Sequence, residues 1–355
     1  MKLEGIDLMQ ANPAADSDGS AIWKSPGWID LQVNGFGGHD FNSSEPDAAN
    51  VGKVAELLLK EGVTCFFPTI ITQSEEHMTR CIRAIIAGCD ANPLARKMVG
   101  GIHLEGPWLS PEEGARGAHA IEHLRLPKET EFLRLQEAAG GKIKLVTLAP
   151  ELPNAVSFIQ KLVRWGIVVS LGHTLATQEQ ITAAVDAGAT LSTHLGNGAP
   201  SVLPRHPNMI WSQLAEDRLL ASVIFDGHHL PPTVMKSIFR TKGVERMILI
   251  SDAAAPARCA PGVYDASIGG KVELSEAGRL SLMGTPYLAG AALGMKEGIT
   301  HAMTQAGATL AEACHMASIN PAKLMNLPLE NIGKTLFKWD AALQQLTILG
   351  TELPS

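Results

Sequence analysis

The sequence predicts an α/β fold, a (β/α)8 TIM barrel with a small, reduced β-sandwich formed from both chain ends. Short apolar runs alternate with amphipathic stretches whose apolar residues recur at spacings of three and four, the pattern of strands connected by helices. Eight such runs occur, and right-handed crossovers curl a parallel sheet the same way each time. Reactive residues stand at the ends of five of the eight predicted strands, and a closed ring would bring those ends together. A doubly wound open sheet is the alternative.

The strand candidates are continuous apolar runs, as expected for strands buried on both faces. They cover 28–33, 63–67, 99–104, 143–148, 167–171, 189–193, 221–225 and 247–250. The helix candidates between them cover 51–60, 78–88, 155–165, 178–187 and 233–240. Gly62, Gly166 and Gly188 stand where a helix should end before the next strand.

The two ends of the chain differ from this pattern. We expect one strand over 2–9, and short strands after the turn-forming Asn320-Pro321, including 345–349. Residues 1–25 and 320–355 are therefore assigned to the small β-sandwich-like domain, and residues 26–319 to the barrel. Alternating apolar and polar residues predict a hairpin over 269–282, inserted after the eighth strand.

Composition excludes several classes of function. The chain has 355 residues, of which 45% are hydrophobic and 18% charged, as in ordinary globular proteins. Its net charge of −7 offers no basic surface for nucleic acid. No apolar run reaches the roughly 18 residues that a membrane span needs. The five cysteines are scattered without metal-ligand spacing, so we expect reduced thiols in a cytoplasmic protein. From the charge and the short apolar runs we expect no binding to nucleic acid or membrane.

Four of the apolar runs lead into Glu105, His173, His194 and Asp252. Catalytic zinc sites use three imidazole or carboxylate ligands and leave a position for water, and Glu105, His173 and His194 match that count. Each of the three alone could be a paired or core residue, but three together at strand ends favour a metal site. Asp252 could cap a helix starting at Ala253, a role that does not exclude its acting as a base.

Two further motifs suggest contacts with substrate. Asp226-Gly227-His228-His229 ends the seventh strand, so at least one of its histidines should face the site. Arg205 lies in a proline-rich loop after the sixth strand. A lone arginine is usually solvated, but on the catalytic face of a barrel it suits a phosphate or a carboxylate.

Seven motifs together resemble the N-acetylglucosamine-6-phosphate deacetylases of the amidohydrolase superfamily, from Pro26 to about Leu327. Several are weak alone, but their order and spacing are specific. They are Pro26-Gly27-Trp28-Ile29-Asp30-Leu31-Gln32-Val33-Asn34-Gly35, His103-Leu104-Glu105-Gly106-Pro107-Trp108, Ser170-Leu171-Gly172-His173, Thr193-His194-Leu195, Asp226-Gly227-His228-His229, Ser251-Asp252-Ala253-Ala254-Ala255-Pro256 and Ala317-Ser318-Ile319-Asn320-Pro321-Ala322.

The resemblance implies that Glu105, His173 and His194 hold one divalent metal ion, zinc or iron. It implies that Asp252 is the general base and then the acid, and that His229 contacts the scissile carbonyl. It also implies a homodimer in which an arginine is donated across the interface. The implied substrate-binding residues are Ala118, His119, Asn197, Gly198, Arg205, Asp226, His229, Leu288, Ala289 and Gly290, with Arg205 the one donated by the partner.

The implied reaction converts N-acetylglucosamine 6-phosphate to glucosamine 6-phosphate and acetate. Two alternatives stay open. One is deacylation of a related substrate, either N-acetylgalactosamine 6-phosphate or an N-acyl amino acid. The other is a catalytically silent homologue that binds a sugar phosphate.

The chain departs from the superfamily pattern at three places. Gln32-Val33-Asn34 replaces the usual His-x-His, and because amides are poor transition-metal ligands a second metal position should be empty. Gly196-Asn197-Gly198-Ala199 lacks the aromatic residue and the methionine that the family usually carries, which widens the pocket wall. The segment before the first barrel strand is also shorter than the family norm.

Overall fold

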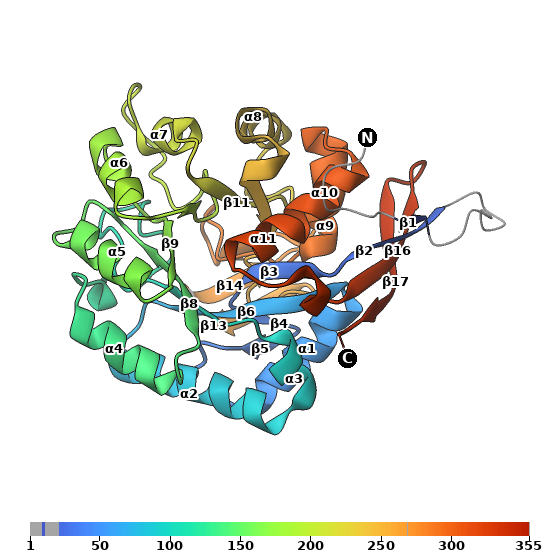
Figure 1. The fold of residues 1–355 in the computed structure, drawn as a ribbon, viewed down its shortest axis with the longest axis horizontal. Coiled ribbons are helices and arrows are strands. Elements are labelled where there is room, and N and C mark those ends of the chain that lie inside the picture. Colours follow the sequence, from blue (N-terminus) through green and yellow to red (C-terminus); the bar gives the residue numbers. More distant parts are fainter. Residues whose placement is uncertain (1–8, 11–20, 268, 355) are drawn as a thin grey trace.

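Eight parallel strands form a nearly closed barrel in the computed structural model, which describes residues 9–10, 21–267 and 269–354 (Figure 1). All eight predicted strands are confirmed, with ends shifted by a few residues. In order around the sheet they are β3 (Trp28–Val33), β6 (Val63–Ile71), β7 (Ile102–Glu105), β8 (Ile143–Leu148), β9 (Val168–Leu171), β10 (Leu191–Ser192), β11 (Leu220–Ile224) and β12 (Met247–Ile250).

The ring closes between β3 and β12. Val33 and Ala253 form an isolated parallel bridge just beyond the two strands. The backbone N–H groups of Asn34 and Gly35 donate to the Ala253 carbonyl at 2.8 and 3.2 Å. The seam therefore lies at the carboxyl ends of the strands, and the doubly wound open sheet is excluded.

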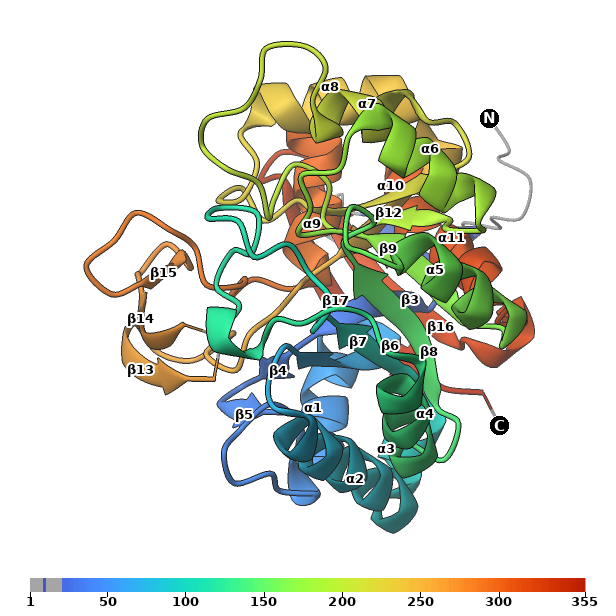
Figure 2. The same ribbon diagram turned by 90° about the vertical axis from the view of Figure 1, so that its left-hand side faces the viewer.

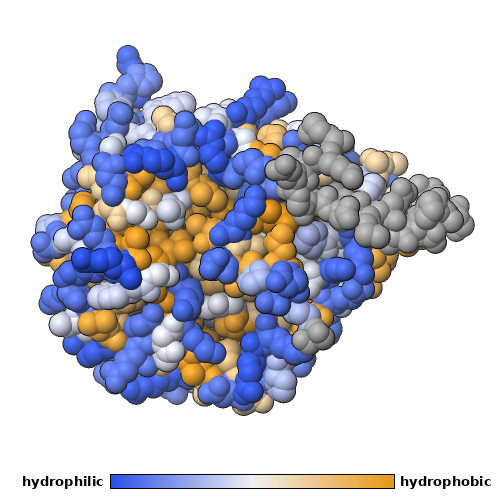
Figure 3. Space-filling model, viewed as in Figure 1, coloured by the Kyte–Doolittle hydropathy of each residue, from blue (hydrophilic) through white to orange (hydrophobic). Residues whose placement is uncertain are grey.

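The helices surround the barrel and bury their apolar faces on it (Figure 1). Figure 3 shows the face of the molecule seen in Figure 1, with hydrophilic residues around its rim and hydrophobic ones towards its middle. The five predicted helices are confirmed as α1 (Ala49–Lys60), α2 (Glu75–Ala91), α5 (Ala155–Arg164), α6 (Gln178–Asp186) and α8 (Pro232–Lys242). The helices not predicted are α3 (Pro93–Met98), α4 (Glu129–Ala138), α7 (Met209–Ala215), α9 (Met295–His301), α10 (Leu310–Ala317) and α11 (Ile319–Leu324). None of the helices in the described ranges is long and apolar enough to cross a membrane.

Both ends of the chain join in one small antiparallel sheet at the right of Figure 1, which confirms the expected β-unit. Its strands are β1 (Met9–Gln10), β2 (Ala21–Pro26), β16 (Lys334–Asp340) and β17 (Gln345–Glu352), in the order β1-β2-β16-β17. The predicted strand over 345–349 lies within β17, whereas the one over 2–9 falls outside the described residues except for Met9. Helix α11 is tied to the barrel, because Asn320 Nδ2 donates to the Met247 carbonyl at 2.6 Å. The domain boundaries at 25 and 320 stay a prediction.

A separate three-stranded antiparallel sheet follows the eighth barrel strand. It contains β13 (Gly262–Ala266), β14 (Gly270–Leu274) and β15 (Leu280–Leu282), so the predicted hairpin is confirmed and β13 was missed. Figure 2 shows this sheet standing out from the barrel, beside the long loop that follows β7. The insertion therefore adds a wall to the carboxyl end of the barrel.

Candidate active site

The candidate site residues share one backbone feature. Glu105 is the last residue of β7, and His173, His194 and Asp252 each follow a strand by two residues. The last three have positive φ angles of 50°, 31° and 51°. A non-glycine residue in this region costs on the order of 1–3 kcal/mol and is found mainly where the surroundings hold it in place, often at functional sites. The same local turn thus directs three side chains into the mouth of the barrel.

Glu105, His173 and His194 converge, as the sequence predicted. Glu105 Oε1 lies 3.1 Å from His194 Nε2 and 3.3 Å from His173 Nε2, and the two nitrogens are 3.1 Å apart. One ligand atom from each residue falls within 4.8 Å of the other two, and all three residues are buried.

The hydrogen bonds around this group fit a metal ion. His173 Nδ1 lies 2.8 Å from the Ala115 carbonyl, to which only an N–H can donate, so a neutral ring keeps a bare lone pair on Nε2. Burial opposes ionisation of Glu105, but when the rings are protonated the hydrogen bonds of His173 and His194 hold the pKa of this carboxyl well below the usual range, and with neutral rings the metal-binding form remains. Lone pairs from two imidazoles and a carboxylate then face one another, an arrangement that a divalent cation would stabilise.

Asp252 is buried beside this group. Asn34 Nδ2 donates to its Oδ1 at 2.8 Å. Burial raises the pKa of Asp252 to about 7, and the charge of Glu105 adds to the rise. No helix starts at Ala253 in the described chain, and the Ala253 N–H donates to Ser251 Oγ at 3.1 Å. Asp252 therefore has no capping role, and its Oδ2 remains available for proton transfer.

His229 is the histidine of its motif that pairs with Asp226. His229 Nδ1 donates to Asp226 Oδ2 at 2.8 Å, and Asp226 Oδ1 accepts the backbone N–H groups of His228 and His229. Burial opposes ionisation of Asp226, but its bonds from His229 lower the pKa. His228 Nε2 lies instead 2.9 Å from the Ala277 carbonyl in the insertion.

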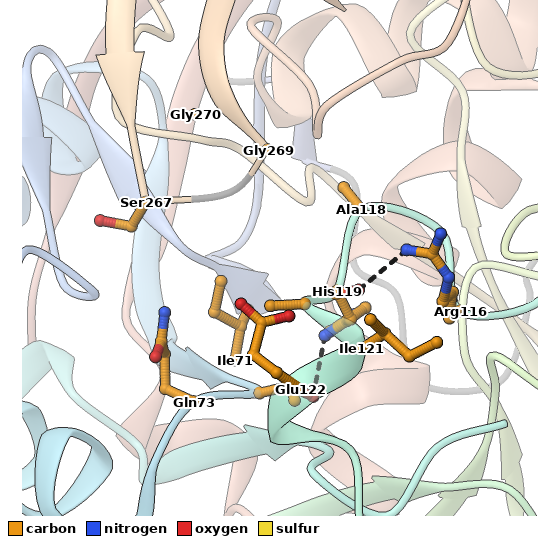
Figure 4. A pocket seen from close by; sticks show the side chains of 12 residues that line it. Ile71, Gln73, Arg116, Ala118, His119, Ile121, Glu122, Ser267, Gly269 and Gly270 are labelled. Atoms are coloured by element: carbon orange, nitrogen blue, oxygen red, sulfur yellow. Dashed lines mark hydrogen bonds between the residues drawn. The ribbon is translucent and has the colours of Figure 1, made fainter. Parts of the chain in front are cut away.

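A cavity of about 310 Å³ adjoins Glu105, His173 and His194, the candidate metal-ligand group, through His119 (Figure 4). His119 lines this cavity, and its Nε2 lies 3.9 Å from Glu105 Oε2 while its Nδ1 meets Thr72 Oγ1 at 2.9 Å. Three segments make the walls: the end of β6, the loop after β7 and the insertion. The lining residues are Ile71, Thr72, Gln73, Arg116, Ala118, His119, Ala120, Ile121, Glu122, Ser267, Gly269 and Gly270.

The loop after β10 packs against the metal-ligand group at one end only. Asn197 donates its backbone N–H to the His194 carbonyl at 2.9 Å, and a Cβ on Gly198 would lie 2.8 Å from His173 Nδ1. Arg205 lies on the exposed part of this loop, without a hydrogen bond or ion pair to the described residues. The structure of one chain does not bring Arg205 into the group around Glu105.

The segment Leu288, Ala289 and Gly290 lies beside Asp252. A Cβ on Gly290 would lie 3.4 Å from the Asp252 carbonyl, which accepts the N–H of Ala291 at 3.0 Å. Sequence reasoning missed the cavity residues Gln73, Arg116 and Glu122. They come from loops and from the end of a strand, and no local pattern singles them out.

The comparisons with known proteins agree with this geometry. Residues 23–334 match the model of the Amidohydrolase family. N-acetylglucosamine-6-phosphate deacetylase of Lysinibacillus sphaericus is 32% identical over 95% of this chain and 83% of its own length. N-acetylgalactosamine-6-phosphate deacetylase of Escherichia coli O157:H7 is 31% identical over 91% of this chain and 83% of its own.

Solved structures give the same result. A mutant of the N-acetylglucosamine-6-phosphate deacetylase from Mycobacterium smegmatis, in complex with N-acetyl-D-glucosamine-6-phosphate, superposes with a TM-score of 0.82. It is 30% identical and covers 97% of this chain and 91% of its own. The Pasteurella multocida enzyme has a TM-score of 0.82 at 27% identity, over 98% of this chain and 89% of its own. The chain belongs to the amidohydrolase family and, within it, to the N-acetylhexosamine-6-phosphate deacetylases.

Proposed function

We propose that this enzyme removes the acetyl group from N-acetylglucosamine 6-phosphate, giving glucosamine 6-phosphate and acetate. The observation that carries the proposal is the buried group of Glu105, His173 and His194 with Asp252 held beside it. One divalent ion per chain would be held by these three ligands, zinc in our proposal and iron as the alternative. When bound, such an ion lowers the pKa of water and polarises the acyl carbonyl.

The remaining chemistry falls to the side chains of the chain. Asp252 takes a proton from the attacking water as the water oxygen bonds to the acyl carbon. The same proton then passes from Asp252 to the leaving nitrogen as the carbon–nitrogen bond breaks, which yields the amine and acetate. His229 donates a hydrogen bond to the acyl oxygen through Nε2, and its Nδ1 bond to Asp226 stabilises the doubly protonated ring that this requires.

The cavity next to His119 supports a small polar substrate. Its volume of about 310 Å³ is at the lower end of the usual range for ligand sites, roughly 300–1,000 Å³. We assign Ala118, His119 and the 288–290 segment to the sugar, and the backbone of Asn197 and Gly198 to the phosphate. In a homodimer, Arg205 would reach the phosphate of the substrate bound in the partner subunit's site. Its exposed position in one chain supports this role.

The galactosamine epimer is the second candidate, because a relative of that specificity matches this chain about as well as the glucosamine enzymes do. Acetate release should be measured from both N-acetylhexosamine 6-phosphates, their unphosphorylated forms and an N-acetyl amino acid. We expect kcat/KM for one phosphorylated sugar to exceed the unphosphorylated form by at least about tenfold, the effect of a charge-assisted phosphate contact. Equal rates with the N-acetyl amino acid, or binding of the sugar phosphate without turnover, would contradict the proposal.

A further inference from the structure

Gln32 and Asn34 each hold a different functional carboxylate. By the sequence resemblance they replace the superfamily's His-x-His, and in the structure both are buried. Gln32 Nε2 donates to Glu105 Oε1 at 2.9 Å, and Asn34 Nδ2 donates to Asp252 Oδ1 at 2.8 Å. Neither amide is only a vacated ligand position, because each makes a direct bond into the candidate site.

An irregularity in β3 aims both side chains at the site. Ile29 and Leu31 pack with apolar residues of the other barrel strands. The pairing of β3 with β6 then shifts between Asp30 and Val33. Gln32 lies within this shifted stretch and Asn34 just after it, and both bond into the site. Irregularities of this kind are common beside active sites, where they redirect a side chain.

The bond from Gln32 controls the orientation of a metal ligand. Glu105 Oε1, which accepts this bond, is also the oxygen that lies within 3.3 Å of both histidine nitrogens. A neutral amide fixes that oxygen without bringing a positive charge to compete with a cation. Partners of this kind, bound to a metal ligand, typically change metal affinity 10- to 100-fold when they are removed.

The bond from Asn34 controls the orientation of the base. The backbone N–H of Asn34 donates to the carbonyl of Ala253, the neighbour of Asp252, and the side chain of Asn34 donates to Asp252 itself. Asn34 is therefore held in place by its main chain while its side chain orients the base. Since the amide nitrogen must face the carboxylate, Asn34 Oδ1 faces away from it, and this oxygen is buried without a partner among the described residues. A buried acceptor is costly to leave unpaired, so it is ready to accept a donor from the attacking water or the substrate.

We propose that β3 divides the support of the site between these two positioning residues, with Gln32 holding the metal ligand Glu105 and Asn34 holding the base Asp252. This inference rests on the proposed function for the role of Asp252. It predicts two separable defects, a loss of metal affinity on one side and a loss of turnover on the other.

The test compares Gln32→Met and Asn34→Leu in the full chain loaded with zinc. Metal affinity is measured by competition with a chromogenic zinc chelator, and kcat and KM are measured at saturating zinc. We expect Gln32→Met to weaken zinc binding about 10- to 100-fold and Asn34→Leu to change it less than about threefold. Asn34→Leu should lower kcat by at least tenfold more than Gln32→Met does, with a smaller change in KM.

Leu31→Val is the matched control, since it alters a buried side chain of the same strand that packs in the barrel core. It should lower the melting temperature without producing either defect. If a variant does not fold, Gln32→Ala or Asn34→Ala replaces it, because these only remove atoms. Equal losses of zinc affinity in the two variants, or wild-type zinc affinity in Gln32→Met, would overturn the division. If the wild type releases no acetate, the proposed function fails, and the contrast in zinc affinity alone decides this inference.

Discussion

The metal-ligand group and the substrate loops are built in different ways. Glu105, His173 and His194 stand on or just after barrel strands, are buried and have nitrogen and oxygen atoms about 3 Å apart. The candidate substrate contacts stand on long loops, and one of them, Arg205, is exposed in the single chain. In the proposed function the rigid barrel would therefore fix the reaction, whereas the loops would determine which acylated molecule binds.

The largest effect on activity should come from a residue that follows a barrel strand, Asp252. Asp252→Asn keeps the shape of the side chain but removes the proton acceptor. General acid–base catalysis contributes roughly 10²- to 10⁴-fold, so kcat should fall by at least that factor. Metal content and melting temperature should stay close to those of the wild type. A variant that keeps a tenth of the wild-type rate would show that another group accepts the proton.

An intermediate effect should come from the exposed loop. In the proposed function Arg205→Ala would remove a charge-assisted phosphate contact worth about 1.5–3 kcal/mol, so kcat/KM for phosphorylated substrates should fall roughly 10- to 100-fold. Unphosphorylated substrates should be affected little. A similar loss for both kinds of substrate would mean that the arginine acts on the fold of the loop.

Mixing of subunits tests whether Arg205 acts across an interface. Asp252→Asn and Arg205→Ala proteins are each impaired at a different residue. If Arg205 completes the neighbouring site, a mixed dimer contains one intact site, and activity should rise above that of both parents. Verified subunit exchange without such a rise would assign Arg205 to its own subunit or to no site.

The smallest effect should come from Gly198, where the loop after β10 touches His173 of the metal-ligand group. Gly198 and Gly140 have nearly the same φ, 58° and 57°. A Cβ on Gly198 would lie 2.8 Å from His173 Nδ1, whereas a Cβ on Gly140 meets nothing within 4 Å. Both Gly→Ala variants should lose about 1–2 kcal/mol of stability from the left-handed backbone. Only Gly198→Ala should also weaken zinc binding, by several-fold, because the new methyl group displaces a metal ligand. Equal zinc affinities in the two variants would contradict this contact.

The sequence was most informative where a local pattern coincides with a structural role. The barrel strands are continuous apolar runs, and His173 and His194 each follow one of them by two residues, so the fold and the meeting of these side chains with Glu105 were predictable together. Strand β13 escaped detection because its residues are mostly exposed and show no alternation in burial. Helix α4 was missed because it buries few apolar residues, chiefly Phe132 and Leu135.

Long-range contacts were beyond local patterns. Asn34 and Asp252 are 218 positions apart, and Gln32 and Glu105 are 73 apart. Their hydrogen bonds depend on closure of the ring and on the irregularity in β3. The resemblance to known enzymes flagged Gln32 and Asn34 as replaced histidines, but only the fold gives each of them a partner.

Titration of the metal-free protein with zinc is the most direct test of a single-metal deacetylase. Acetate release from N-acetylglucosamine 6-phosphate should be measured as zinc is added, with bound metal determined in parallel. The three ligands Glu105, His173 and His194 predict that activity is absent in the stripped protein and rises to a plateau at about one ion per chain. Full activity in the stripped protein, or a plateau only at two tightly bound ions, would contradict the account.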